Sequence, residues 1–390
     1  MLNTEFSPWP SYTEEEAEAA KRVLLSNKVN YWTGEECRKF EQEFAQFAHS
    51  AFAIAVSNGT TALELALNAI GVGHEDEVIV PPRTFLATAS AVVTQGGTPV
   101  FADVELESGN IDPASIEAAI TDKTKAIICV HLAGWPCDMD KIMALAKKHD
   151  LYVIEDCAQA HGATYKGKSV GSIGDIGCWS FCQDKIMTTG GEGGMVTTNE
   201  KALWQKMWAY KDHGKSYDSV YNKSHPPGFR WLHDSFGTNY RMTEMQAAIG
   251  RIQLTRMPQW SEARRENAEQ IRAVVSNCEL LKDYTPAEES SHAYYKLYFY
   301  VDESRLKDGW SRDRIVEAVV SQGVPCYQGS CSEIYLEKAF TNAGFTQPRL
   351  PVAKKLGEIS LMLLVHPTLT PAEISKTCAV LESVIRDAQI

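Results

Sequence analysis

The sequence predicts an α/β fold, in which a large domain with a mostly parallel sheet between two helical layers is followed by a smaller α+β domain. The chain has 390 residues, of which 44% are hydrophobic, and this is enough for more than one core. From about residue 50 to residue 200, short β-branched runs alternate with segments of helical period, as in β-α-β units. This alternation then stops. We therefore place the large domain, with an N-terminal arm, at residues 1–250 and the smaller domain at residues 251–390.

Seven apolar runs are predicted to form the strands of the large sheet, at 51–56, 77–82, 98–104, 124–134, 151–157, 177–181 and 193–198. Two of the segments between them, 60–70 and 139–149, carry apolar residues at the three- and four-residue spacing of an amphipathic helix. This order of elements favours helices on both faces of the sheet.

The second half of the chain has a different pattern. An irregular aromatic stretch at 212–240 leads into helical segments from Thr243 to about Asn277, which we expect to be interrupted at Pro258. A strand is predicted at 294–301, a helix at 311–323 and a final helix after 371–376.

Charge and composition exclude several classes of function. The 38 basic and 50 acidic residues give a formal net charge of −12, and no Lys- or Arg-rich stretch interrupts the acidic balance, so we expect neither nucleic acid nor a membrane as partner. The sequence shows no signal peptide and no apolar run long enough to span a bilayer, so we expect a cytoplasmic protein. The ten cysteines form no C-x-x-C pair and lack histidines at zinc spacing, which predicts reduced thiols and no metal site.

A polar loop follows the first predicted strand, at Ser57–Ala62. Its small residues would leave backbone N–H groups open at the start of a helix, where they favour a phosphate. Taken alone, the loop is better explained as an ordinary Ser/Thr helix cap.

Two adjacent acids, Glu155 and Asp156, end the predicted strand at 151–157. A carboxylate at the carboxyl end of a parallel strand lies where α/β folds bind ligands, and beside a pyridine nitrogen it would keep that nitrogen protonated. Neighbouring residues in a strand point to opposite faces, so only one of the two can serve. Spacing does not decide between them, and both could instead cap the next helix.

Lys185 lies 29 positions after Asp156 and precedes a glycine cluster at 190–194. Most lysines are solvated surface residues. An apolar strand before this lysine and four glycines in five residues suit a lysine that forms a Schiff base with a closely packed cofactor. A further polar turn, Gly237–Met242, alone predicts only a helix cap.

Taken together, these motifs resemble the DegT/DnrJ/EryC1/StrS sugar aminotransferases, a branch of the fold-type I enzymes that use pyridoxal phosphate (PLP). The resemblance runs nearly end to end, and the motifs that carry it are SNGTTALELAL, DEVIVPPRTFLATASAV, GGTPVFADV, VHLAGWPCDMD, VIEDCAQAHGA, GDIGCWSF, the Lys185 segment with GGEGGMV, GTNYRMTEMQAAIG and His366-Pro367. It implies a PLP-binding large domain of the fold-type I transferases.

The resemblance also implies roles for eight residues. Lys185 would carry the cofactor covalently, Asp156 would pair with the pyridine nitrogen and Phe85 would stack on the ring. The other five expected cofactor contacts are Gln159 at the ring's 3-oxygen, Gly59, Thr60 and Ser180 at the phosphate, and Asn239, which would reach the phosphate of a neighbouring subunit. A homodimer with two shared sites follows.

The reaction implied is transfer of an amino group from L-glutamate to a keto sugar, which we expect to be a nucleotide-linked keto-deoxyhexose used for surface polysaccharide or a secondary metabolite. Relatives that dehydrate at C3 carry a histidine at the lysine position, so Lys185 argues for amination. Three alternatives stay open: a cyclitol or non-nucleotide keto sugar as acceptor, a PLP-binding regulatory protein without turnover, and an unrelated α/β enzyme that uses the Ser57–Ala62 loop for a nucleotide phosphate.

Overall fold

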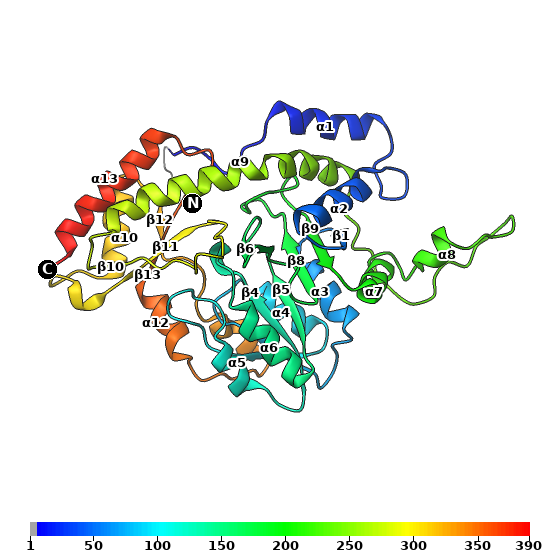
Figure 1. Cartoon of the computed structure of the whole chain (residues 1–390), viewed down its shortest axis with the longest axis horizontal. Coiled ribbons are helices and arrows are strands. Elements are labelled where there is room, and N and C mark those ends of the chain that lie inside the picture. Colours follow the sequence, from blue (N-terminus) through cyan, green and yellow to red (C-terminus); the bar gives the residue numbers. More distant parts are fainter. Residues whose placement is uncertain (1–5) are drawn as a thin grey trace.

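The structure is a computed structural model and describes residues 6–390. Its centre is a seven-stranded sheet in the order β1-β9-β8-β5-β4-β2-β3, in which only β9 runs antiparallel to its neighbours (Figure 1). The strands are β1 (Phe52–Val56), β2 (Glu77–Val80), β3 (Thr98–Phe101), β4 (Thr124–Val130), β5 (Tyr152–Asp156), β8 (Ile176–Ser180) and β9 (Gly194–Thr198). Each coincides with one of the seven predicted runs, so the predicted α/β fold is confirmed.

Helices cover both faces of this sheet because successive strand residues point to opposite sides. In β1, Ile54 and Val56 join the core beneath α3 (Gly59–Ala69), α4 (Ala87–Thr94) and α7 (Lys201–Lys211). Ala53 and Ala55 face the opposite core, which includes α2 (Glu36–Phe47). Further along that face, α5 (Pro113–Ala119) and α6 (Met139–His149) cover β2, β4 and β5.

A second, four-stranded sheet lies beside the first, in the order β10-β11-β13-β12, and is antiparallel throughout. Its strands are β10 (Leu281–Lys282), β11 (Leu297–Val301), β12 (Cys326–Tyr327) and β13 (Ser360–Leu363), and its core includes residues of α10 (Arg312–Ser321), α12 (Pro351–Ile359) and α13 (Pro371–Ala388). The predicted strand at 294–301 starts only at Leu297. Tyr294 has a left-handed backbone (φ 48°), and the N–H of Tyr295 donates to the carbonyl of Ala133 instead of a strand.

One helix connects the two parts of the molecule. Figure 1 shows α9 (Glu244–Val275) running from α13 to α2 and α1 (Glu14–Leu25). The interruption expected at Pro258 is wrong, since the helix continues through this residue and is buried on either side of it, at Met257 and Trp260. The boundary predicted between residues 250 and 251 therefore lies inside one continuous helix.

The remaining elements are short: β6 (Thr164–Tyr165), β7 (Lys168–Ser169), α8 (Tyr217–Tyr221), α11 (Lys338–Asn342), and three 3₁₀ turns, η1 (Leu132–Gly134), η2 (Glu303–Arg305) and η3 (Ile334–Leu336). In the part of the chain that the structure describes, no helix has the length and apolar character needed to cross a bilayer.

Candidate active site

The predicted site residues converge because three strands end at one edge of the large sheet. Val56 at the end of β1 and Ser180 at the end of β8 both pair with Gly194, while Asp156 at the end of β5 pairs with Cys178 of β8. The segments that follow these strand ends therefore start close together, at the edge where α/β sheets bind ligands.

The loop after β1 offers an anion site. The side chain of Asn58 accepts the N–H of Thr61 at 2.9 Å, which leaves the N–H groups of Gly59 and Thr60 available at the start of α3. A Cβ at Gly59 would lie 2.6 Å from the Cβ of Ser180, so only glycine allows the Ser180 hydroxyl this close to the helix N-terminus. Two N–H groups and a hydroxyl at a helix N-terminus fit a phosphate.

The glycine cluster brings protein backbone together. A Cβ at Gly194 would clash with the carbonyl of Asn58, and one at Gly193 would clash with the hydroxyl of Thr189. The glycines thus allow β9 to pack directly against the phosphate-type loop. A Cβ at Gly191 would meet nothing within 4 Å, so the predicted close approach of a cofactor to this cluster stays a prediction.

Asp156 is a buried carboxylate whose hydrogen-bond donors are all neutral. The hydroxyl of Thr88 donates to Oδ2 at 2.9 Å and the N–H of Ala158 donates to Oδ1 at 3.2 Å. Burial raises the pKa of Asp156 above its ordinary value, although Thr88 and Ala158 act in the opposite direction. A buried carboxylate with this environment fits a ligand that brings a positive charge, such as a protonated pyridine nitrogen.

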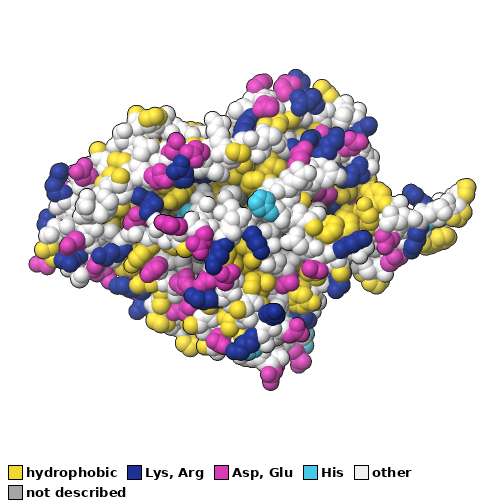
Figure 2. All heavy atoms as spheres, in the orientation of Figure 1, with side chains coloured by type: hydrophobic (Ala, Val, Ile, Leu, Met, Phe, Trp, Pro, Cys, Tyr) yellow, Lys and Arg dark blue, Asp and Glu magenta, His cyan; other side chains and the backbone are white. Residues whose placement is uncertain are grey.

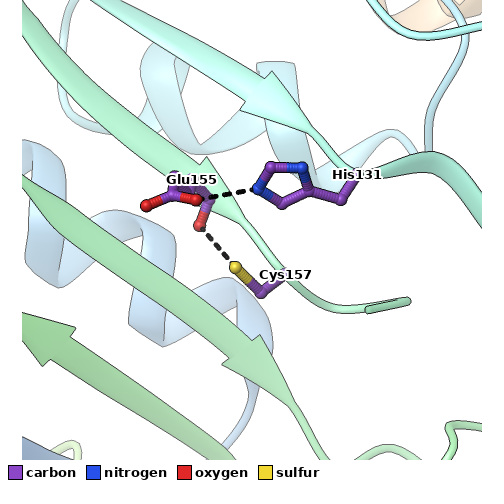
Figure 3. Close-up of side chains that lie close together, drawn as sticks. All are labelled: His131, Glu155 and Cys157. Carbon is purple, nitrogen blue, oxygen red and sulfur yellow. Dashed lines mark hydrogen bonds and ion pairs between the residues drawn. The ribbon is translucent and has the colours of Figure 1, made fainter. Parts of the chain in front are cut away.

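Glu155, the neighbour of Asp156 in β5, points towards His131 (Figure 3). Its carboxylate contacts Nε2 of His131 at 2.9 Å and accepts the N–H groups of Gly171, Ile173 and Gly174 at 2.7–2.8 Å. The structure thus separates the two adjacent acids, which spacing alone could not.

The group His131, Glu155 and Cys157 has ligand atoms within 4.8 Å of one another, as a metal site would. Because hydrogen-bond donors already engage both oxygens of Glu155, we interpret the group as internal support for β5. Burial lowers the pKa of His131, whereas contacts with Cys157 and Glu155 raise it. Geometry favours the neutral ring, because Nδ1 accepts the N–H of Cys137 at 3.0 Å and cannot also carry a proton.

A cleft of about 710 Å³ opens between the two sheets and includes three of the predicted residues, Phe85, Gln159 and Lys185. Phe85 is 72% exposed, which is unusual for a phenylalanine and suits a ring that stacks on a ligand. The Oε1 atom of Gln159 accepts the N–H of Ala133 at 2.7 Å. Asp156, Gly59, Thr60 and Ser180 lie outside the lining of this cleft, at the strand ends described above.

Lys185 is held by residues that the sequence did not point to. The indole N–H of Trp9 donates to the Lys185 carbonyl at 2.8 Å, and the amine of Lys185 lies 5.2 Å from the centroid of the Tyr295 ring. Asp184 accepts the hydroxyl of Tyr295, and its other oxygen is 3.7 Å from the amine of Lys185. Trp9 and Tyr295 are far from Lys185 in sequence. Both are aromatic residues in segments without a recognisable motif, and nothing else in the sequence indicates that they contact Lys185.

Asn239 does not join the other predicted residues. It is exposed, it does not line the cleft, and its backbone forms an isolated bridge with Asp212. It directly follows a segment that projects from the body of the protein beyond α8 (Figure 1). We call residues 217–236 the arm. The carbonyl of the next residue, Tyr240, accepts the N–H of Ser57, so the base of the arm is fixed to the loop after β1.

Comparison with known proteins gives matches along nearly the whole chain. The DegT/DnrJ/EryC1/StrS aminotransferase family model matches residues 10–382. The chain is 36% identical to GDP-perosamine synthase of Escherichia coli O157:H7, over 95% of each chain. It is 37% identical to the UDP-N-acetyl-3-dehydro-alpha-D-glucosamine 3-aminotransferase of Acidithiobacillus ferrooxidans, over 92% of this chain and 90% of the relative. Among solved structures, an aminotransferase from Psychrobacter cryohalolentis superposes with a TM-score of 0.96 at 63% identity, over 98% of this chain and 99% of the other.

Proposed function

The chain belongs to the DegT/DnrJ/EryC1/StrS aminotransferase family, whose enzymes use PLP, and on that premise we propose that it moves an amino group from L-glutamate to a nucleotide-linked keto sugar. It is a transaminase of a family that serves amino-sugar biosynthesis. What we propose beyond this is the identity of the amino donor, the class of the acceptor and the roles of the site residues. The observation that carries it is the joint presence of the Lys185 amine, the exposed Phe85 ring and Gln159 in one cleft, close to the buried carboxylate of Asp156.

The residues fit the cofactor at both of its ends. The N–H groups of Gly59 and Thr60 and the hydroxyl of Ser180 would hold the phosphate, since unpaired N–H groups at a helix N-terminus favour an anion. Asp156 would hold a proton at the ring nitrogen, and the charge gained there would offset the cost of burying its carboxylate.

Bound PLP supplies a conjugated ring that delocalises the electron pair released when the donor's α-carbon loses its proton. Lys185 would move that proton, because its side chain lies inside the cleft and its carbonyl accepts the indole N–H of Trp9. Phe85 would cover one face of the ring and exclude water from it, and Gln159 would lie beside the ring's 3-oxygen.

We also propose that the active form is a homodimer in which the arm lies on the second copy. Three aromatic side chains of the arm are almost fully exposed, Phe229 at 79%, Trp231 at 82% and Phe236 at 99%. Figure 2 shows hydrophobic side chains along the projecting segment and around its base. Monomeric proteins rarely leave such a group uncovered. A second copy seated on the arm would cover it and would bring Asn239, at its base, towards the neighbouring site.

The test is a single turnover with L-glutamate. The PLP-loaded protein should release one equivalent of 2-oxoglutarate and change the visible absorption of the cofactor, whereas a Lys185→Ala variant should do neither. A Lys147→Ala variant, which alters an exposed lysine on α6, serves as control. Protein that binds PLP and releases no 2-oxoglutarate would contradict the proposed donor and leave a binding role.

The acceptor is tested after the donor. The aminated enzyme is offered UDP-, GDP- and dTDP-linked 3-keto and 4-keto sugars, together with a keto cyclitol and a free keto sugar. We expect an amino sugar, detected by mass spectrometry, from a nucleotide-linked compound alone. Amination of the cyclitol or the free sugar in preference would overturn the proposed acceptor.

A further inference from the structure

Lys296 is a cation in the active-site cleft for which the functions proposed above provide no role. It directly precedes β11 and lines the cleft together with Lys185. Burial lowers its pKa to about 8, with the charges of Arg264 and Lys185 acting in the same direction and Asp184 opposing them. Among residues 6–390, its ammonium forms no hydrogen bond or ion pair. A desolvated cation of this kind favours an anionic ligand.

Lys296 and Lys185 share an aromatic neighbour. The ammonium of Lys296 lies 4.9 Å from the centroid of the Tyr295 ring, and that of Lys185 lies 5.2 Å from the same centroid. The two nitrogens are therefore within about 10 Å of each other, whatever their directions from the ring. A small molecule that reacts at Lys185 can thus reach Lys296.

Positive charge exceeds negative charge on this wall of the cleft. Arg264 lies behind it and is 1% exposed. Its Nη1 atom donates to the carbonyls of Tyr294 and Tyr295, while Nε and Nη2 have no partner among the described residues. The adjacent acid, Asp184, is engaged by the hydroxyl of Tyr295 and by Lys185.

The other titratable groups of the cleft do not alter this balance. His366 lines it as a neutral ring, since burial and the charges of Arg264 and Lys296 lower its pKa to about 3. Glu337 also lines the cleft, but it is exposed and forms no ion pair with Lys296 among the described residues. The positive charge of Lys296 is therefore free to bind a negatively charged ligand.

We propose that Lys296 binds a carboxylate of the amino donor, and this rests on the donor proposed above. The α-carboxylate of an amino acid is bonded to the same carbon as the amine that reacts at Lys185, so it stays close to that residue. The diphosphate of a nucleotide sugar is attached at C1, and the sugar ring separates it from a keto group at C4. A cation that shares the Tyr295 ring with Lys185 therefore suits the carboxylate better than the diphosphate.

The experiment compares Lys296→Met, which removes the charge, with Lys296→Arg, which keeps it, and Lys147→Met as a surface control. Each PLP-loaded protein is titrated by calorimetry with glutarate, a dicarboxylate that has the carbon chain of glutamate but neither an amine nor a keto group, and separately with UDP. Loss of a charged hydrogen bond should weaken glutarate binding about 10- to 100-fold in Lys296→Met. Lys296→Arg should restore most of the affinity, and UDP binding should not change.

Wild-type affinity for glutarate should also fall as pH rises through about 8, where the ammonium loses its proton, and Lys296→Arg should abolish that dependence. Equal glutarate binding in wild type and Lys296→Met would overturn the proposal. Loss of UDP binding alone would assign Lys296 to the nucleotide instead. Because glutarate is not turned over, a wild type that binds it through Lys296 but releases no 2-oxoglutarate from glutamate would contradict the proposed donor and leave the carboxylate site intact.

Discussion

The hydroxyl of Thr88 lies 2.9 Å from Oδ2 of Asp156 and links helix α4 to the end of strand β5. The hydroxyl of Thr84, which lines the cleft, lies 2.9 Å from that of Thr88. Since Asp156 is buried and both of its donors are neutral, Thr88 contributes directly to keeping the carboxylate ionised. Thr88 is thus a positioning residue for the group proposed to pair with the cofactor.

We predict that Thr88→Val weakens PLP binding about tenfold or more, because a lost hydrogen bond to a charged group costs about 1.5–3 kcal/mol. The pKa of Asp156, already raised by burial, should rise further. Thr88→Ser, which keeps the hydroxyl, serves as control. PLP affinity is measured by titrating the cofactor-free protein at several pH values, and the loss in Thr88→Val should be greater at acidic pH. Equal affinities for the valine and serine variants would show that the hydroxyl has no such role.

The strands of the large sheet could be predicted because their local pattern and their long-range packing agree. β1 is a continuous apolar run and β4 becomes one after Lys125, as strands covered on both faces should be. The prediction failed where tertiary contacts override local propensity. Pro258 lies inside α9 because the helix is packed between two cores, and Tyr294 is turned out of β11 by a left-handed backbone.

Only the site residues that lie in recognisable motifs could be predicted from the sequence. Lys185, Phe85 and Gln159 line one cleft, and their roles toward a cofactor stay predictions. Spacing does not distinguish Glu155 from Asp156, and the resemblance alone selects Asp156. The structure adds the physical difference between them, since Glu155 meets His131 and Asp156 meets Thr88. Trp9, Tyr295 and Lys296 approach Lys185 across more than 100 positions of sequence, and no local pattern encodes such a contact.

Gly59→Ala should weaken PLP binding by more than tenfold and leave the fold in place. Its new Cβ would be built 2.6 Å from the Cβ of Ser180, and the hydroxyl proposed to contact the phosphate would have to move. The matched control is Gly73→Ala, since a Cβ there would meet nothing within 4 Å. Dissociation constants for PLP and for inorganic phosphate are compared. Unchanged affinity for both would argue against a phosphate site at the start of α3.

Glu155→Gln should lower the free energy of unfolding by about 3 kcal/mol near pH 7, because a neutral amide replaces a fully buried carboxylate that accepts charge-assisted hydrogen bonds from three backbone N–H groups. Burial raises the pKa of Glu155, but the hydrogen bond from His131 and those from the backbone N–H groups lower it more, and the net shift is downward. A lowered pKa means that the ionised carboxylate stabilises the fold above about pH 4.3, the value for an unfolded chain, and that this stabilisation is lost as pH falls further.

The difference in the free energy of unfolding between wild type and Glu155→Gln, measured by urea unfolding, should therefore become smaller as pH falls below about 4.3. Glu117→Gln is the control. It removes a carboxylate with a similarly lowered pKa from an exposed ion pair with Lys148, and this should shift the unfolding midpoint little. A difference that stays constant as pH falls well below about 4.3 would show that Glu155 stabilises the fold without its charge.

Replacing Phe229 and Trp231 of the arm with serine should shift the protein from dimer to monomer. Both side chains are exposed in the single chain, and burying them against a second copy would stabilise the dimer through their apolar area. Light scattering on the wild type should give twice the chain mass. The control is Leu106→Ser, which changes an exposed apolar residue outside the arm. A wild type that is monomeric at all concentrations would contradict the shared site.

Subunit mixing tests whether Asn239 acts across that interface. Lys185→Ala and Asn239→Ala proteins are each expected to have little activity alone. In a mixed dimer, one of the two sites would combine an intact Lys185 with an intact Asn239 from the partner. Random reassortment should thus restore about a quarter of wild-type activity, since half of the dimers are mixed and each has one complete site. If Asn239 acts only within its own chain, mixing gives no recovery beyond the average of the two variants, because the Asn239→Ala chains still lack the residue they need.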